Sequence, residues 1–266
     1  FVKVCLFILI PFVGFTQENT KEEKANELDG VIVTASRKKE SIKEVVSSIT
    51  IVGEKKIQSQ TIVNSNIGNI LQYTVPSLAT SSNQTSNFGQ TLRGRPFLVM
   101  IDGIPQSTPL RNGGRDLQVI DPSSIERVEV IKGATSIYGN GADGGIINYI
   151  TKKNRSDDKV NGSVQLGLMT QPKTFAESFG YRTSLSLTGK LKKFDYVLGF
   201  TQERSGVTKD ANSENLSPFY SLSNLNVYNG LIKIGYNVSE KQRLEFSYIG
   251  YASKSFLDQD VREGKW

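Results

Sequence analysis

The sequence predicts a mixed α/β domain followed by the first strands of an antiparallel β-sheet that spans a membrane. Three observations support this fold class. Before Arg155, apolar runs of unequal length alternate with loops rich in Gly, Asn and Ser. After Arg155, about five segments of about 11 residues alternate apolar and polar side chains, which is the period of a β-strand. The 24 glycines, 13 phenylalanines and 10 tyrosines are more typical of a β protein than of a helical one.

The composition excludes several classes of protein. The chain has no histidine, so it offers no imidazole for acid–base catalysis, for a Ser-His-Asp triad or for a metal site. Its one cysteine, Cys5, permits no disulfide within the chain and no cysteine-rich zinc site. The net charge of +6 is scattered, unlike the basic face of a nucleic-acid-binding protein. We therefore expect no metal, no cofactor and no nucleic-acid partner.

The first segment, 1–17, indicates a signal peptide. An apolar run from Val4 to Phe15 follows Lys3 and, at about 12 residues, is too short for a membrane-spanning helix. The start of a buried helix is the alternative, but a charged stretch, 18–27, follows directly and disfavours it. Because the sequence opens with Phe, we expect at least one residue to precede it, and we expect the mature protein to be exported.

A short strand-forming segment, Leu28–Arg37, follows the charged stretch. Its centre combines valine, isoleucine and threonine, which favour extended backbone. An isolated β-prone segment between polar flanks is suited to pair with the edge of a partner's sheet. The alternative is that it forms the first strand of the domain that follows.

The next region is expected to fold as one compact mixed domain. Apolar residues Ile62, Ile67, Ile70 and Leu71 recur at helical spacing, and this helix should end before Pro76. Two polar loops should interrupt the domain, at Ser81–Gln90 and Gln106–Asp116. Four segments are expected to contribute strands: Ser48–Val52, Phe97–Pro105, Ile120–Gly133 and Gly144–Lys153.

The alternating segments after Arg155 have the length and the aromatic ends of membrane β-strands. In one of them, Tyr228, Ile232 and Tyr236 oppose Asn229 and Lys233. About ten alternating residues can cross a bilayer when the strand is tilted, with lipid on one face and a polar lumen on the other. A soluble β-sandwich has the same alternation. The connections favour the barrel, because a short join at 190–194 and a long polar one at 202–224 are typical of an outer-membrane barrel.

One motif suggests a nucleotide site and is rejected. Gly139, Gly141 and Gly144 match the G-x-G-x-x-G dinucleotide fingerprint. That fingerprint must open a helix whose N-terminus holds the pyrophosphate, but the residues that follow are β-branched and strand-like. We therefore expect these glycines to serve tight turns.

Three motifs together resemble a known family. The segments LRGRPFLVMIDGIP (Leu92–Pro105), IDPSSIERVEVIKGATSIYGNGADGGIINYITK (Ile120–Lys152) and DGVIVTA (Asp29–Ala35) are similar, in this order, to the plug and TonB box of TonB-dependent outer-membrane transporters. The resemblance implies a plug inside a 22-stranded barrel that imports scarce ligands, most often ferric siderophores. Only about five strands are present, and an open sheet would leave an unpaired edge in lipid, so we expect a piece of a longer receptor.

The resemblance divides the chain into four parts: a signal peptide (1–17), a periplasmic linker with the TonB box (18–44, box at 29–35), the plug (45–155) and the first strands of the barrel (156–266). It also implies site residues. The box, which would pair with the energy-transducing partner TonB, comprises Asp29, Gly30, Val31, Ile32, Val33, Thr34 and Ala35.

The resemblance implies two further groups of plug residues. Arg93 and Arg127 match arginines that meet glutamates on the barrel wall and lock the plug, although a solvated turn is the alternative for Arg93. The two polar loops correspond to the apices that face the ligand. The ligand-facing candidates in them are Asn83, Gln84, Phe88, Gln106, Arg111, Asn112 and Arg115.

The ligand class is what the resemblance implies, because ADGGIINYITKK (Ala142–Lys153) looks most like ferric-siderophore receptors. Only the charged stretch 18–27 separates the signal peptide from the box, which disfavours signalling receptors and glycan importers, and a plug without histidine disfavours haem receptors. We expect a non-enzymatic importer of a ferric siderophore in the Gram-negative outer membrane, in contact with lipid and with TonB. The alternatives are an importer of vitamin B12 or another metal chelate, a non-transporting surface β-protein and, less well supported, a secreted enzyme.

Overall fold

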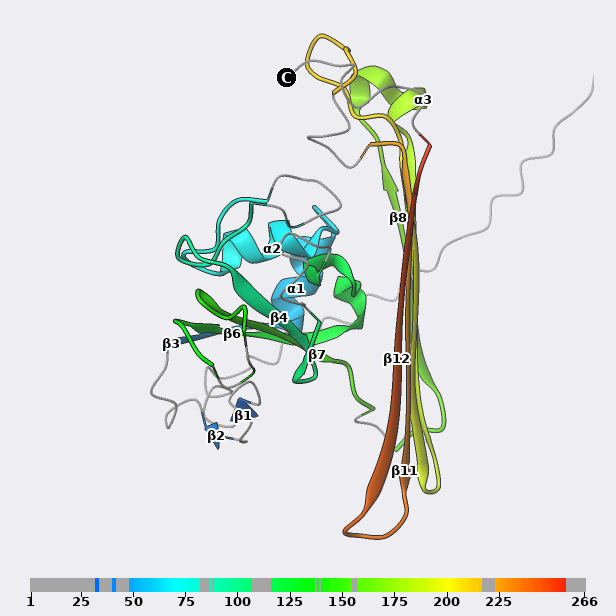
Figure 1. Ribbon diagram of the computed structural model, residues 1–266. Coiled ribbons are helices and arrows are strands. Elements are labelled where there is room, and N and C mark those ends of the chain that lie inside the picture. Colours follow the sequence, from blue (N-terminus) through cyan, green and yellow to red (C-terminus); the bar gives the residue numbers. More distant parts are fainter. Residues whose placement is uncertain are drawn as a thin grey trace, which may run out of the picture.

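The computed structural model of the chain consists of a mixed domain and a sheet of five long strands that stands beside it (Figure 1). The residues that the structure describes are 32–33, 40–41, 48–81, 87, 89–106, 116–136, 138, 140–154, 157–216 and 223–256. Among them, no helix has both the length and the apolar character needed to cross a membrane. The expected signal peptide lies outside the described residues.

The mixed domain (48–154) is built on one five-stranded sheet. Its strand order is β3-β6-β7-β4-β5, and only the β4–β7 pair is parallel. Strands β4 and β7 are buried along their whole length because the domain covers both faces of the sheet. The expected strands are confirmed, with these bounds: β3 Ser48–Gly53, β4 Phe97–Ile101, β5 Ile104–Pro105, β6 Ile125–Lys132 and β7 Gly145–Thr151.

Two α-helices pack against this sheet, and one sequence-based expectation about them was wrong. Helix α2 (Ile67–Thr74) ends before Pro76 as expected, but Ile62 lies outside it in a turn and is 88% exposed. A separate helix, α1 (Glu54–Thr61), precedes this turn and was not predicted. Its only buried residue is Ile57, so its sequence has almost no apolar periodicity.

Polar side chains and glycines set the ends of these elements. The Asn66 side chain accepts hydrogen bonds from the backbone N–H groups of Gly68 and Asn69 at 2.9 and 3.4 Å, which caps α2. A Cβ atom on Gly144 would overlap the carbonyl oxygen of Leu92, and strand β7 follows directly. Strand β7, and not a helix, therefore follows the glycine-rich motif, so the rejection of the nucleotide site stands. Two 3₁₀ turns, η2 (Asp116–Gln118) and η3 (Pro122–Ser124), precede β6.

The long sheet (157–256) is antiparallel throughout, in the strand order β12-β11-β10-β9-β8. At one end its strands turn tightly; at the other they are joined by longer connections, which include the short η4 (Pro172–Thr174) and α3 (Phe175–Ser178) (Figure 1). Its strands are β8 Asn161–Met169, β9 Gly180–Leu191, β10 Phe194–Ser205, β11 Leu225–Asn237 and β12 Arg243–Ser255.

The alternation that the sequence predicted separates two faces of the long sheet. We name the face toward the mixed domain the inner face; it buries Ser184, Thr201 and Lys233. The opposite, outer face is apolar and open. Its exposed side chains include Val164, Leu166, Leu168, Phe200, Ile232, Ile234, Leu244, Phe246 and Tyr248. A sheet with one open apolar face is suited to lipid contact.

Candidate functional site at the contact between the mixed domain and the long sheet

An arginine of the long sheet joins the two parts of the molecule. Arg182 of β9 forms a bidentate ion pair with Asp121 of the mixed domain: Nη2 lies 2.7 Å from Oδ1 and Nη1 lies 2.9 Å from Oδ2. Nη1 also donates to Glu203 of β10 at 3.0 Å. The three side chains are 11%, 4% and 16% exposed, so one cation neutralises two largely buried carboxylates.

The local sequence holds Asp121 ready for this arginine. Asp121 precedes Pro122 and caps η3, because its Oδ1 accepts the backbone N–H of Ser123 at 2.8 Å and the Ser123 hydroxyl at 2.5 Å. These bonds fix the carboxylate on the surface of the mixed domain. The short Asp-Pro-Ser-Ser segment therefore presents a pre-oriented acid to the inner face.

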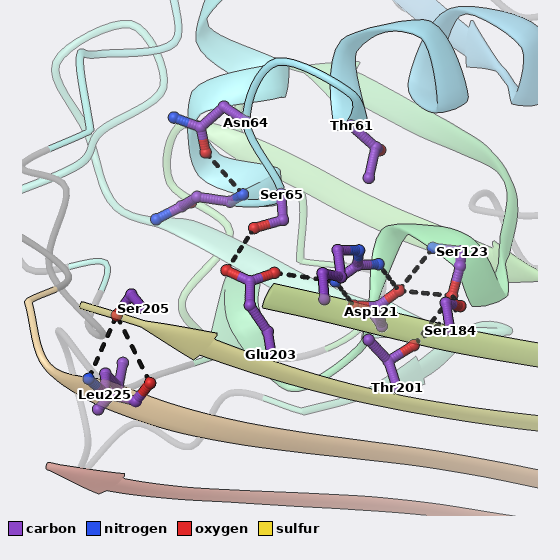
Figure 2. Close-up of polar contacts among 12 residues, drawn as sticks. Thr61, Asn64, Ser65, Asp121, Ser123, Ser184, Thr201, Glu203, Ser205 and Leu225 are labelled. Carbon is purple, nitrogen blue, oxygen red and sulfur yellow. Dashed lines mark hydrogen bonds and ion pairs between the residues drawn. The ribbon is translucent and has the colours of Figure 1, made fainter. Parts of the chain in front are cut away.

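Hydroxyl groups extend the contact on both sides of the ion pair. Ser123 lies 2.9 Å from the Ser184 hydroxyl and 3.2 Å from the Thr201 hydroxyl. On the other side, Ser65, just before α2, donates to Glu203 at 2.8 Å. Figure 2 shows Ser65, Glu203, Asp121, Ser123, Ser184 and Thr201 converging in the space between the ribbons. The 3₁₀ turn and the start of α2 are thus both tied to the same patch of the inner face.

A glycine allows the two parts to approach at this point. A Cβ atom on Gly199 of β10 would lie 2.8 Å from the hydroxyl of Ser124, closer than side-chain carbons normally come. Gly199 shares the inner face with Thr201, two residues further along the strand. The absence of a side chain here lets η3 rest on the sheet.

A second contact lies on β11. Lys233, with its side chain 5% exposed, donates from Nζ to Asp102 Oδ2 at 3.0 Å and to the Thr151 hydroxyl at 2.7 Å. Asp102 is held in the turn between β4 and β5, with φ at 49°, and accepts from the Thr151 hydroxyl at 2.6 Å and the Thr151 backbone at 3.0 Å. The expected Asp-Gly turn therefore also anchors the domain to the sheet.

Charged pairs continue along the inner face toward its tight turns. Arg243 forms two hydrogen bonds with Asp195, at 2.5 and 2.7 Å, and its guanidinium occupies the space that a Gly235 side chain would fill. Lys190, near the end of β9, lies 2.5 Å from Asp157, which precedes β8 and lies outside the strands. That hydrogen bond, with the charge of Lys190, lowers the pKa of the Asp157 carboxyl below its ordinary value. Within the described residues, no cluster of acidic, cysteine or histidine side chains could hold a metal ion.

The two arginines expected to lock the domain lie as follows. Arg127 of β6 contacts Glu126 and Glu129 of its own domain, both at 2.8 Å, and Glu129 is completely buried. Arg93 is exposed, has φ at 55° and donates its backbone N–H to the carbonyl of Ser77 at 2.8 Å. A contact of either arginine with a wall glutamate stays a prediction.

The other expected site residues are only partly described. Gln106 is exposed, and its amide donates to the carbonyl of Ile104 at 3.0 Å. Within the expected TonB box, Ile32–Val33 form strand β1, which pairs with β2 (Glu40–Ser41). The remaining candidates lie outside the described residues: Asp29, Gly30, Val31, Thr34, Ala35, Asn83, Gln84, Phe88, Arg111, Asn112 and Arg115.

The sequence analysis missed the residues that make the contact. It placed Lys233 on a polar face, but it named neither Lys233 nor Arg182 as a site residue. A signal was present, because a charged residue within a strand whose opposite face is apolar needs a partner. The identity of the partners was not readable, since Asp121 and Asp102 lie 61 and 131 residues away in the sequence.

This architecture is that of a plug domain on the inner wall of a membrane barrel. Buried ion pairs hold the mixed domain on the polar face of an antiparallel sheet, and the other face of that sheet is apolar. Residues 41–146 match the family model of the TonB-dependent Receptor Plug Domain. The chain belongs to the family of TonB-dependent receptors. The expected fold class is confirmed, and the mixed domain is called the plug from here on.

Relatives and solved structures agree with this assignment. The rhizobactin receptor of Rhizobium meliloti (strain 1021) is 31% identical over 274 residues, which cover 99% of this chain and 36% of that receptor. The ferric aerobactin receptor of Klebsiella pneumoniae is 35% identical over 126 residues, covering 47% of this chain and 17% of the relative. The siderophore receptor PirA of Acinetobacter baumannii has the same fold, with a TM-score of 0.57 and 21% identity over 84% of this chain and 34% of its own. The chain thus spans about a third of the rhizobactin receptor's length.

We predict that Arg182→Met loosens the plug. The substitution leaves the Asp121 and Glu203 carboxylates buried without their cation, which should lower the free energy of local opening by about 3 kcal/mol. Hydrogen exchange of the amides around Ser123 in the purified receptor measures this opening. Arg243→Met is the matched control, because its partly exposed pair should contribute about 1 kcal/mol or less. Equal opening in the two variants would contradict the assignment.

Proposed function

We propose that this chain is the plug and the first wall strands of an outer-membrane receptor that imports a ferric siderophore with energy delivered through TonB. The family assignment supports import, and the names of similar receptors support the ligand class: rhizobactin, ferric aerobactin and ferrienterobactin. The observation that carries the proposal is the contact between the plug and the wall. It places a folded domain across the lumen-facing side of a membrane sheet.

The chemistry of this contact suits a gate. Hydroxyl groups and charged pairs at Arg182, Ser123 and Lys233 supply most of the hydrogen bonds between plug and wall. A hydrogen bond within a protein contributes only about 1 kcal/mol net, because water can replace either partner. A plug held in this way can be loosened as water enters. A fully apolar interface would lose about 25 cal/mol for each Å² exposed on the same movement, with no hydrogen bonds to water in return.

The TonB box is proposed at 29–35. Its described part, β1, is already in extended conformation and hydrogen-bonded to β2, which supports a segment able to add to another sheet. We propose that the box pairs with a strand of TonB on the periplasmic side, and that force along the chain reaches the plug through β3. Arg93 and Arg127 are retained as proposed contacts with further wall strands.

The proposed ligand is a siderophore rather than haem. Hemin receptors are also similar to this chain; that of Yersinia pestis is 24% identical over 225 residues, which is 83% of this chain. The plug, however, offers no histidine to bind haem iron, whereas a siderophore already saturates its iron and needs only polar contacts. Those contacts are proposed at Gln106 and at the loop residues Asn83, Gln84, Phe88, Arg111, Asn112 and Arg115.

A growth experiment tests the ligand class. A strain that lacks the receptor gene should fail to grow on one ferric siderophore as sole iron source and should grow normally on ferric citrate and haem. A plasmid copy of the gene should restore growth. Normal growth of the deletion strain on every siderophore of a broad panel would count against siderophore import. Expression of the receptor gene that does not change with iron supply would also count against it.

A proline substitution tests the TonB box. Val33→Pro removes a backbone donor from the segment, so it should reduce energy-dependent accumulation of labelled ferric siderophore at least about tenfold while binding to cells stays unchanged. Val33→Ala keeps the backbone donor and should retain most uptake. Binding and accumulation are measured side by side. Full accumulation in the proline variant would remove this segment as the coupling strand.

A further inference from the structure

The outer face of the long sheet carries a group of basic and aromatic side chains near the end with the longer connections. Arg204 of β10 and Lys254 of β12 flank the ring of Phe256. The guanidinium carbon lies 5.5 Å and the ammonium nitrogen 5.1 Å from the ring centroid. We name Arg204, Lys254, Phe256 and the intervening Asn226 the rim cluster. All four lie outside the plug contact.

The strand register builds this cluster into one row. Arg204 pairs with Tyr181 on one side and with Asn226 on the other, and Asn226 pairs with Lys254. Paired residues of an antiparallel sheet point to the same face, so the side chains of Tyr181, Arg204, Asn226 and Lys254 form one row across β9 to β12, and Phe256 directly follows β12. Neighbouring strands are about 4.8 Å apart, which places the Cα atoms of Arg204 and Lys254 about 10 Å from each other.

The row lies at the edge of the apolar band. At the other end of the outer face, the rings of Phe194 and Tyr236 are in contact, with their centroids 4.5 Å apart and their planes tilted by 34°. Aromatic residues are enriched at membrane interfaces. The interval from Asn226 to Tyr236 spans about 33 Å along β11, or about 25 Å across the membrane at a tilt of about 40°, which equals the height of the apolar band in such barrels. The rim cluster therefore lies at the level of lipid headgroups.

The connections decide which leaflet this is. The β9–β10 hairpin turns at Lys192–Lys193, whereas β10 and β11 are joined at the rim-cluster end by the long segment 206–224 (Figure 1). Outer-membrane barrels have short periplasmic turns and long extracellular loops. The rim cluster accordingly belongs to the outer leaflet.

The charges of the rim cluster lack an anion. Among the described residues, neither Arg204 nor Lys254 has a carboxylate partner, and both side chains are exposed on the face opposite to the plug. The side-chain oxygen Oδ1 of Asn226, a residue 8% exposed, has no hydrogen-bond donor in the described part of the chain. Two cations that each lie within 5.5 Å of the same ring centroid, with an acceptor on the strand between them, fit an anionic group that also carries N–H or O–H donors.

We propose that the rim cluster binds the phosphorylated sugar headgroup of an outer-leaflet glycolipid. Arg204 and Lys254 contact phosphate, Asn226 accepts from a headgroup hydroxyl or amide, and Phe256 packs against the sugar or the first acyl carbons. The basic side chains near the surface attract anionic lipid, as in other membrane proteins. This inference rests on the proposed location of the long sheet in the outer membrane.

Native mass spectrometry of the detergent-purified receptor tests the inference, with bisphosphorylated lipid A and its fully dephosphorylated form as probes. We expect the receptor to retain the phosphorylated probe. Arg204→Gln/Lys254→Gln should weaken its retention roughly fivefold for each cation removed and roughly 25-fold for the pair. The control, Lys192→Gln/Lys193→Gln, removes the same charge at the opposite end of the sheet and should leave retention unchanged.

Two results would overturn the inference: equal loss in both double variants, or equal retention of the phosphorylated and dephosphorylated probes. Binding of the ferric siderophore is measured on the same samples. If the unsubstituted receptor binds the siderophore but does not retain the lipid selectively, only the lipid-binding role of the rim cluster is refuted. If the unsubstituted receptor binds no siderophore, the proposed function is refuted.

Discussion

The placement of the plug on the wall depends on one guanidinium. Arg182 cannot remain buried at 11% exposure without counter-charges, and it finds them in Asp121 and Glu203. Because Asp121 caps η3 and Glu203 accepts from Ser65 beside α2, the same ion pair fixes two separate segments of the plug. Gly199 and the hydroxyl groups around Ser123 complete the fit around this charged centre.

The second anchor has a different character. Lys233 meets Asp102 in a turn of the plug sheet, and the Thr151 hydroxyl at the end of β7 accepts a hydrogen bond from Lys233 and donates one to Asp102. Asn148 of β7 contacts Gly103 of that turn at 3.0 Å and the buried Glu129 at 3.3 Å, and Glu129 in turn pairs with Arg127. Polar contacts therefore run from the wall through the interior of the plug sheet to the arginine that is proposed to meet the remainder of the wall.

Much of this fold followed from the sequence. The buried strands β4 and β7 appear as continuous apolar runs, and the alternation of β11 placed Lys233 and Tyr228 on opposite faces. Helix α1 was missed because Ile57 is its only buried residue, and Ile62 was assigned to a helix because its apolar character fitted a spacing that the turn interrupts. The plug–wall pairs could not be predicted, because the register between two separately folded parts depends on tertiary packing. Local sequence shows that Arg182 needs an acid but not that Asp121 supplies it.

The central claim is that η3 of the plug rests on β9 at Ser184 in the resting receptor. The most direct measurement is disulfide formation in the Ser123→Cys/Ser184→Cys receptor, whose native hydroxyl oxygens lie 2.9 Å apart. Mild oxidation of intact cells should cross-link most of this variant, whereas Ser123→Cys/Ser163→Cys, with its second cysteine on the next strand, β8, should remain largely reduced. Cross-linking of Ser123→Cys/Ser184→Cys that is no faster than in the control would contradict this account of how the plug is held.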